Sequence, residues 1–252
     1  MKRLLCIIGV LLMLAGSASA QAVPAEAALR GTVLYPQGST ADTASFAYSY
    51  RLPRFADTQP EYEAINAYFA AYAAELEGTV IPQTAGTLDT LPAAGEPAYY
   101  VNTDYSITEN TADILSVLLI SQEFSGNTLL ESWSSVVFAV SGIYAGQPIT
   151  LSQAMGLEQT ADGLAQDTAS ELAYGLVWQI VQYEIAAMQK AYFPDVTEAD
   201  LRRAFTPERD FYFDGDGNFV FFIQAGTIAG EVEGVLTFPF SLAELLSAIG
   251  KG

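Results

Sequence analysis

The sequence predicts an α+β fold, with antiparallel strands in one sheet or two, helices packed on one face, and one long helix. Two observations lead to this class. Apolar residues alternate in several segments that short turns connect, as in antiparallel strands. Segments with helical spacing come in blocks and do not follow every strand, which argues against a parallel sheet with crossover helices. The expected order is strand, helix, three strands, short helix, long helix, short helix, three strands and helix.

The first residues are typical of an export signal. The basic pair Lys2 and Arg3 precedes an apolar run over residues 4–14, which is too short to span a bilayer. Small residues at 18–20 supply a cleavage site, so we expect the signal to be removed after Ala20. The protein is then expected to be secreted or associated with the cell envelope, with no membrane span after cleavage.

Residue types that the chain lacks exclude several chemistries. It has no histidine, and its one cysteine, Cys6, would leave with the signal. Histidine-dependent catalytic triads, histidine-ligated zinc, cysteine nucleophiles and disulfides are therefore excluded from the mature chain. We expect a protein with no catalysis of its own and no cofactor.

The chain is strongly acidic. It carries 29 Asp and Glu against 10 Lys and Arg, a formal net charge of −19, which becomes −21 once Lys2 and Arg3 are removed. Such a charge repels nucleic acid and attracts basic proteins. It also keeps a secreted protein soluble, and solubility is the simpler explanation of the same excess.

The N-terminal part is expected to contain one strand and one helix. Residues 21–42 include an alanine-rich stretch and should form a flexible leader. Alternation in "TASFAYSYRL" predicts a strand over residues 43–52. A helix should begin at a capping box formed by Thr58 and Glu61, and Gly78 should end it. A long loop rich in Thr, Gly and Pro is expected next.

Three strands are predicted to follow, over residues 98–108, 113–124 and 131–144, because β-branched and aromatic residues are frequent there. Thr150 and Gln153 then form the capping box of a short helix.

The longest helix is expected from about Asp162 to Tyr192, since Pro194 prevents its continuation. Its buried face should carry residues at helical spacing: Leu172, Leu176, Ile180, Tyr183 and Ala187. A short helix capped by Thr197 comes next.

The stretch "FYFDGDGNFVFF" allows two interpretations. Asp214, Asp216 and Asn218 are spaced like the first ligands of a calcium loop. However, Phe219 and Ala225 occupy the positions where such a loop needs glycine and glutamate. Asp-Gly between alternating aromatic strands is a strong hairpin signal, so we predict a turn and no metal site. A last strand in "GEVEGVLTFPF" and a helix with a Ser-Glu capping box end the chain.

Several segments in this order resemble a known bacterial arrangement. They are "FAYSYRLPRF", "EYEAINAYFAAY", "YYVNTDYSITENTADILSVLL", "GIYAGQPITLSQAM" and "FYFDGDGNFVFFIQAGTIAGEVEGVLTFPFSLAELL". Together they resemble an extracytoplasmic region in which a PdaC-type domain precedes an RsiV-type C-terminal domain. The resemblance implies a signal at 1–20, the leader at 21–42, a PdaC-like region at 43–130 and an RsiV-like region at 131–252. We expect the last two to form one continuous unit.

The resemblance implies a role in binding. Such regions occur in an anti-sigma factor that senses lysozyme and as the accessory part of a peptidoglycan deacetylase. The deacetylase metal site needs histidine, which this chain lacks. The resemblance therefore implies a binding, sensing or accessory module, with cell-wall glycan or a basic protein such as lysozyme as its partner.

Aromatic side chains are the candidate binding residues. Trp133, Tyr99, Tyr100 and Tyr105 can stack on sugar rings or anchor a partner, although core packing is the usual role of such residues. Trp178 is expected in the core.

Two alternatives stay open. A glycan hydrolase needs only two carboxylates, and Glu231 and Glu233 would share one face of a strand, where solvent exposure is the simpler expectation. A purely structural envelope protein is the other alternative.

Overall fold

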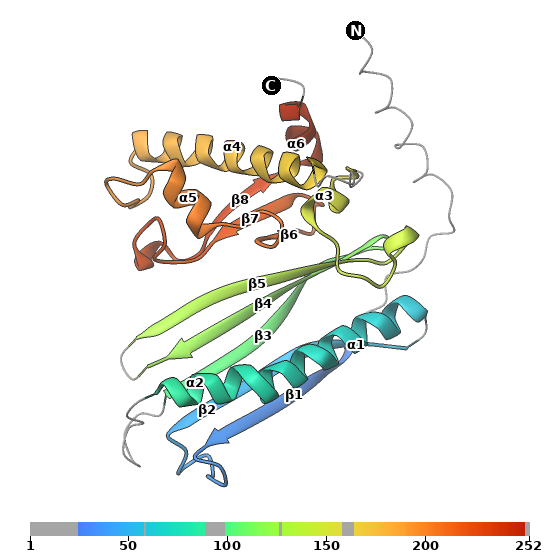
Figure 1. The fold of residues 1–252 in the computed structure, drawn as a ribbon, viewed down its shortest axis with the longest axis vertical. Coiled ribbons are helices and arrows are strands. Elements are labelled where there is room, and N and C mark those ends of the chain that lie inside the picture. Colours follow the sequence, from blue (N-terminus) through green and yellow to red (C-terminus); the bar gives the residue numbers. More distant parts are fainter. Residues whose placement is uncertain (1–24, 58, 89–98, 126–127, 158–163, 250–252) are drawn as a thin grey trace.

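The computed structural model describes residues 25–57, 59–88, 99–125, 128–157 and 164–249. It confirms the α+β class: a five-stranded sheet and a three-stranded sheet, each with helices. In Figure 1 the larger sheet and its helices lie below the smaller sheet and its helices.

The larger sheet has the strand order β1-β2-β3-β4-β5. Its strands are β1 (Ala25–Tyr35), β2 (Phe46–Phe55), β3 (Tyr99–Asn110), β4 (Ile114–Phe124) and β5 (Leu129–Ala139). Neighbours are antiparallel except β2 and β3, which run parallel because α1 connects the ends of the sheet between them.

One face of this sheet is covered by α1 (Pro60–Glu75), a π-helical turn (Leu76–Val80) and α2 (Ile81–Thr87). The strict alternation in β2 buries Phe46, Tyr48, Tyr50 and Leu52 on this side. They form one hydrophobic core with Tyr62, Ile65 and Phe69 of α1.

The second layer pairs β6 (Phe211–Phe213), β7 (Phe219–Ile223) and β8 (Leu236–Phe240) as an antiparallel sheet. Its helices are α3 (Leu151–Ala154), α4 (Leu164–Ala186), α5 (Glu198–Ala204) and α6 (Leu242–Ile249). Alternate strand residues such as Phe219 and Phe221 join the buried side of α4 in a second core.

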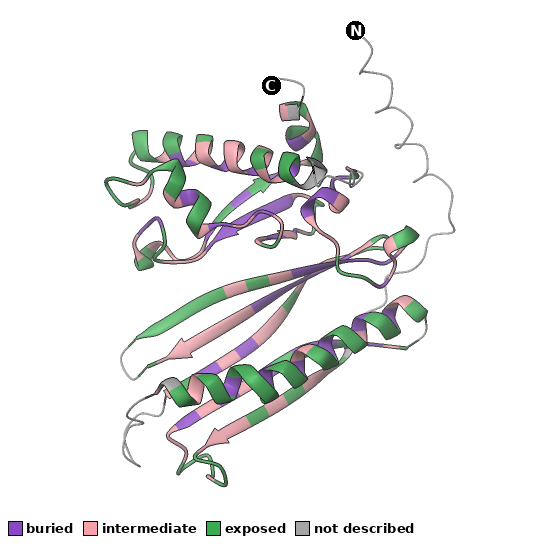
Figure 2. Ribbon diagram, viewed as in Figure 1, coloured by how far each residue is buried: buried purple, intermediate pink, exposed green. Residues whose placement is uncertain are grey.

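The two sheets meet through polar contacts as well as rings. Ser135 Oγ in β5 donates to the carbonyl of Phe211 at 2.5 Å, and the N–H of Phe213 donates to Ser116 Oγ at 3.0 Å. These bonds lie on the face of the larger sheet opposite α1, so the layers follow the order helix, sheet, sheet, helix. Only part of that face is covered: Figure 2 shows β5 changing from buried near Ala139 to exposed near Leu129.

Half of the expected leader at 21–42 is instead a strand, β1, and the first four residues of the leader lie outside the described residues. β1 pairs with β2 along its whole length, and Leu29 and Val33 pack on the first core. Gly31 lies so close to Tyr50 that an added Cβ would meet the ring at 2.3 Å. Alanine-rich composition concealed this strand because Ala has little β propensity.

The boundary expected at residue 130 between the two family-like regions can be located in the structure. It falls inside the β4–β5 hairpin, whose strands are paired from Phe124–Leu129 to Ile114–Ala139. The larger sheet therefore extends to Ala139, and the chain passes to the second layer after it.

The first helix differs at both ends from its expected form. Its N-cap is Gln59, without a side-chain cap, and Thr58 lies outside the described residues. Gly78 does not end it, because the chain continues through the π-helical turn into α2. A buried anchor explains the continuation: Leu76 and Ile81 both pack into the first core on either side of Gly78.

In α4 the buried residues lie one position later in the sequence than the residues that were expected to be buried. Ala169, Ala173, Val177 and Val181 are fully buried, whereas Tyr183 and Ala187 are exposed. Leu172, Leu176 and Ile180 are partly buried beside them. Small residues at four-residue spacing let the helix axis approach the sheet, so they take the central stripe. The helix ends at Ala186, earlier than expected.

Candidate binding face

The half of the larger sheet that the second layer does not cover carries side chains in regular rows. On the face opposite α1, the register aligns side chains of all five strands in rows that cross the sheet. We call three of these rows, toward the β4–β5 turn, the open face. Neighbouring strands are about 4.8 Å apart, so one row spans roughly 19 Å.

The first row is apolar. Tyr100 is 41% exposed, and its ring stacks on Phe124 with a centroid distance of 4.9 Å and an interplanar angle of 21°. The pair places two stacked aromatic rings on a partly exposed region of the sheet. The row consists of Leu34, Ala47, Tyr100, Phe124 and Leu129.

The second row is polar. Ser49 Oγ donates to Asn102 Oδ1 at 2.9 Å, and Gln122 Nε2 donates to Glu131 Oε2 at 3.3 Å. Among the described residues, nothing bonds to Asn102 Nδ2 or Gln122 Oε1, which leaves one donor and one acceptor toward solvent. The row consists of Thr32, Ser49, Asn102, Gln122 and Glu131.

The third row contains charged residues and the indole of Trp133. Arg51 pairs with Asp104 at 2.8 Å, and Trp133 Nε1 donates to Glu131 Oε1 at 2.8 Å. Arg30 forms no ion pair with any residue that the structure describes. The row consists of Arg30, Arg51, Asp104, Ile120 and Trp133.

Trp133 is held where the open face meets the second layer. The side-chain amide of Gln224 bonds to its backbone N–H and C=O at 3.0 and 2.7 Å. Its ring also packs edge-on against Tyr212 and Phe222, at 6.0 to 6.3 Å between centroids. The indole is therefore pre-positioned, and it loses little conformational entropy when a ligand contacts it.

The structure separates the sequence-predicted aromatic residues into two groups. Tyr100 and Trp133 lie on the open face. Tyr99 and Tyr105 lie against the first core instead. Burial and a hydrogen bond to Glu123 raise the pKa of Tyr99. The Arg51 guanidinium carbon lies 5.5 Å from the centroid of the Tyr105 ring. Trp178 packs against the second core, as expected.

Sequence reasoning missed the polar members of the open face, Asn102, Gln122 and Glu131. Alternation alone marks them as outward residues. Their alignment depends on the registers of the β3–β4 and β4–β5 hairpins, and the parallel pairing of β2 with β3 adds Ser49 to the same row.

A second feature is a cleft of about 470 Å³ between the two layers, lined by Tyr68, Ser134, Glu208 and Asp210 among others. Burial raises the pKa of both carboxyl groups, against the opposing effect of backbone hydrogen bonds. Asp210 accepts from the N–H of Thr206 at 2.6 Å, which closes the turn before β6.

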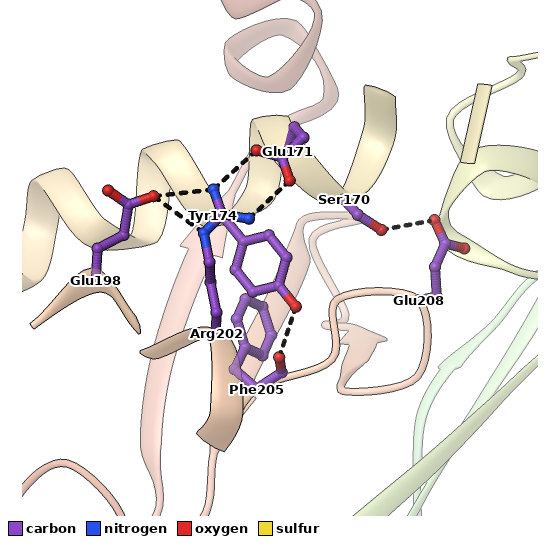
Figure 3. A network of polar contacts seen from close by, with 7 residues as sticks. All are labelled: Ser170, Glu171, Tyr174, Glu198, Arg202, Phe205 and Glu208. Atoms are coloured by element: carbon purple, nitrogen blue, oxygen red, sulfur yellow. Dashed lines mark hydrogen bonds and ion pairs between the residues drawn. The ribbon is translucent and has the colours of Figure 1, made fainter. Parts of the chain in front are cut away.

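Figure 3 shows how Glu208 is held. Ser170 Oγ of α4 donates to Glu208 Oε1 at 3.4 Å, so this carboxylate joins the cleft to α4. In the same view, Arg202 of α5 forms a bidentate pair with Glu171 of α4, at 2.7 and 2.8 Å. The two carboxylates that line the cleft, Glu208 and Asp210, therefore both form hydrogen bonds that stabilise the fold.

The hairpin prediction for the "FYFDGDGNFVFF" stretch is confirmed. β6 and β7 pair as predicted, and Asp214 Oδ1 accepts from the N–H groups of Asp216 and Asn218 at 3.0 and 2.9 Å. Burial alone would raise the pKa of Asp214, but the bonds from Asn218 and Asp216 outweigh it and lower the pKa. The aspartate oxygens stabilise the turn.

Glu231 and Glu233 do not lie on a strand. They belong to the 3-10 helix η3 (Glu231–Glu233), and Glu233 Oε1 accepts from the N–H of Ala191 at 3.0 Å. Gly230 and Gly234 flank this turn and interrupt the strand pattern that the sequence suggested.

The described residues contain no group of three or more Asp, Glu, His or Cys placed to hold a metal ion. None of their helices is long and apolar enough to cross a bilayer.

When the chain is compared with known proteins, similar folds are found among solved structures. No family model and no curated protein matches the chain. A member of the DUF3298 family from Bacteroides fragilis NCTC 9343 is 13% identical, with a TM-score of 0.48 over 88% of this chain and 98% of that one. A DUF3298 family protein from Pseudomonas aeruginosa PAO1 is 15% identical, with a TM-score of 0.47 over 89% and 93%. The resemblance to PdaC-type and RsiV-type domains stays a prediction.

Proposed function

We propose that this protein is an exported, non-catalytic binding module of the bacterial cell envelope, and that it binds a glycan chain across the open face. The observation that carries the proposal is the arrangement of the rows. A stacked pair of aromatic rings, Tyr100 and Phe124, lies beside a polar row that crosses the sheet.

A glycan fits this chemistry better than other polymers. Sugar rings have apolar faces that stack on aromatic rings and hydroxyl groups that need both donors and acceptors. The open face offers the ring of Tyr100, the donor Asn102 Nδ2 and the acceptor Gln122 Oε1 side by side. Nucleic acid is disfavoured by the net charge of −19. The row length of roughly 19 Å suits an oligosaccharide more than a single sugar.

A sedimentation assay with insoluble peptidoglycan tests the proposal. We expect the wild-type protein to pellet with the polymer, and Tyr100→Ala and Gln122→Ala to remain largely in the supernatant. Tyr183→Ala is the matched control, because Tyr183 is 64% exposed on α4, away from the open face. Equal pelleting of the Tyr100 and Tyr183 variants would refute the proposal.

The cleft favours one second candidate, a carboxylate-dependent glycan hydrolase. Glu208 and Asp210 line it, and the raised pKa of each suits a general acid. Release of reducing sugar from peptidoglycan, abolished by Glu208→Gln and by Asp210→Asn, would support it. Their bonds to Ser170 and Thr206 favour a structural role instead.

A further inference from the structure

The end of the second layer carries a surface that the open face does not use. There the connection between α4 and α5 runs beside the segment that leads into η3. The N–H of Phe193 donates to the carbonyl of Ile228 at 3.0 Å, and the N–H of Gly230 donates to that of Ala191 at 3.1 Å. In Figure 1 this connection lies at the left end of the second layer.

Large apolar side chains are exposed on these two joined segments and on the last turn of α4 before them. Met188 is 91% exposed and Val232 is 90% exposed, and Ile185 and Phe193 are also exposed. We call these four residues the apolar end. Exposed apolar residues that stand singly are normal, whereas four of them on hydrogen-bonded neighbouring segments make this end a candidate interaction surface.

The backbone holds Met188 in an unfavourable conformation. Its φ is 52°, and within the described ranges no other residue except glycine has a positive φ. Bonds from Met188 N to Ile185 O at 3.1 Å and from Gln189 N to Glu184 O at 3.0 Å fix it there. The bond from Gln189 to Glu184 is that of a Schellman cap, so the left-handed conformation of Met188 ends α4. Here it displays a flexible apolar side chain to solvent.

Carboxylates flank the apolar end. Asp195 and Glu231 are exposed, and neither has an ion pair with any residue that the structure describes. The nearby cation, Lys190, is neutralised by Glu184 at 3.0 Å. The rim is therefore negative, as is the protein, with a net charge of −19. A second copy of the chain would bring the same charge to the same surface, which opposes self-association.

We propose that the apolar end docks a basic, amphipathic segment of a partner protein. Met188 and Val232 would contact the apolar face of the segment, and Asp195 and Glu231 would pair with its Lys or Arg residues. The apolar end and the open face have no residue in common, so the proposal assigns the glycan and the protein partner to different residues.

A synthetic helical peptide of leucine and lysine, with its leucines on one face, is the probe. A peptide of the same composition, scrambled to remove that face, is the control ligand. By isothermal calorimetry on the full-length mature protein, we expect the amphipathic peptide to bind and the scrambled one to bind at least about tenfold more weakly.

Variants locate the site. Met188→Ser combined with Val232→Ser should weaken binding about tenfold through lost apolar contact. Ile143→Ser is the matched control, since Ile143 is 86% exposed on another loop. Asp195→Asn with Glu231→Gln should weaken binding at low salt more than at high salt, while Asp216→Asn should not.

Three results would overturn the proposal. One is equal binding of the two peptides, and another is equal affinity of the Met188/Val232 and Ile143 variants. The third is a dimer in light scattering that dissociates in the Met188/Val232 variant, because the apolar end would then be an interface between copies of the chain.

Discussion

The side-chain amide of Gln224 bonds to both the backbone N–H and the backbone C=O of Trp133. It takes the place of a paired strand at the edge of β5, and it joins the second layer to the open face. The planar amide presents a donor and an acceptor side by side, which match the C=O and N–H of one residue, and asparagine is the only other side chain with this group.

Replacing Gln224 should loosen this junction. We expect Gln224→Ala to lower the free energy of unfolding by about 1–3 kcal/mol, since two backbone groups lose their partners. Gln224→Glu keeps only the bond from the N–H, so it should also be destabilised. Urea titration gives the free energies, with Gln182→Ala on the exposed side of α4 as the control. Equal stability of the Gln224 and Gln182 variants would contradict the role of the junction.

Two glycines test the corrections to the N-terminal elements. Gly31→Ala places a Cβ against the ring of Tyr50, whose hydroxyl is held by Glu77 at 2.6 Å, so the ring cannot move freely. We expect a loss of about 1–3 kcal/mol. Gly78→Ala meets open space within a helical segment and should be neutral or stabilising by up to about 1 kcal/mol. Thermal melts compare the two. A neutral Gly31→Ala would indicate that β1 is not packed as described.

The position of α4 rests on its small residues. Ala173 is fully buried against the sheet, so Ala173→Leu should overpack the core and cost about 1–3 kcal/mol. Ala187→Leu, at an exposed position just beyond the helix, is the control. If both substitutions were tolerated equally in urea titration, the buried stripe would be placed wrongly.

Glu208 should give stability a dependence on pH. Burial raises its pKa in the folded state above the ordinary value, so the folded protein binds the proton more tightly than the unfolded chain. Wild-type stability should therefore fall as the pH rises from the unfolded pKa through the folded one. Glu208→Gln removes this contribution to the fall, which urea titrations from about pH 4 to pH 7 can measure. The exposed Glu63→Gln is the control. Identical pH profiles for wild type and Glu208→Gln would refute the assignment.

Local patterns predicted the elements that short-range chemistry determines. The capping boxes at Thr150–Gln153 and at Thr197 are present, as is the hairpin at Asp214. Patterns failed where tertiary packing decides. Gly78 does not end a helix because flanking residues anchor it, and the alanine-rich β1 forms because β2 provides a partner.

The sequence likewise indicated some residues of the candidate site and missed others. The sequence indicated Tyr100 and Trp133, because aromatic side chains can stack on sugar rings or anchor a partner. It did not distinguish them from Tyr99 and Tyr105, since a one-residue difference in strand position decides the face. The polar row depends on the order of strands in the sheet, which local spacing does not encode.

Fluorescence of Trp133 tests the central claim most directly. The chain has two tryptophans, so Trp178→Phe leaves Trp133 as the only reporter, at the edge of the open face. Titration with soluble peptidoglycan fragments should give a saturable change in emission, which Tyr100→Ala abolishes and Tyr183→Ala preserves. An emission spectrum that does not change with added glycan, or a change that persists fully in the Tyr100→Ala background, would contradict binding at the open face.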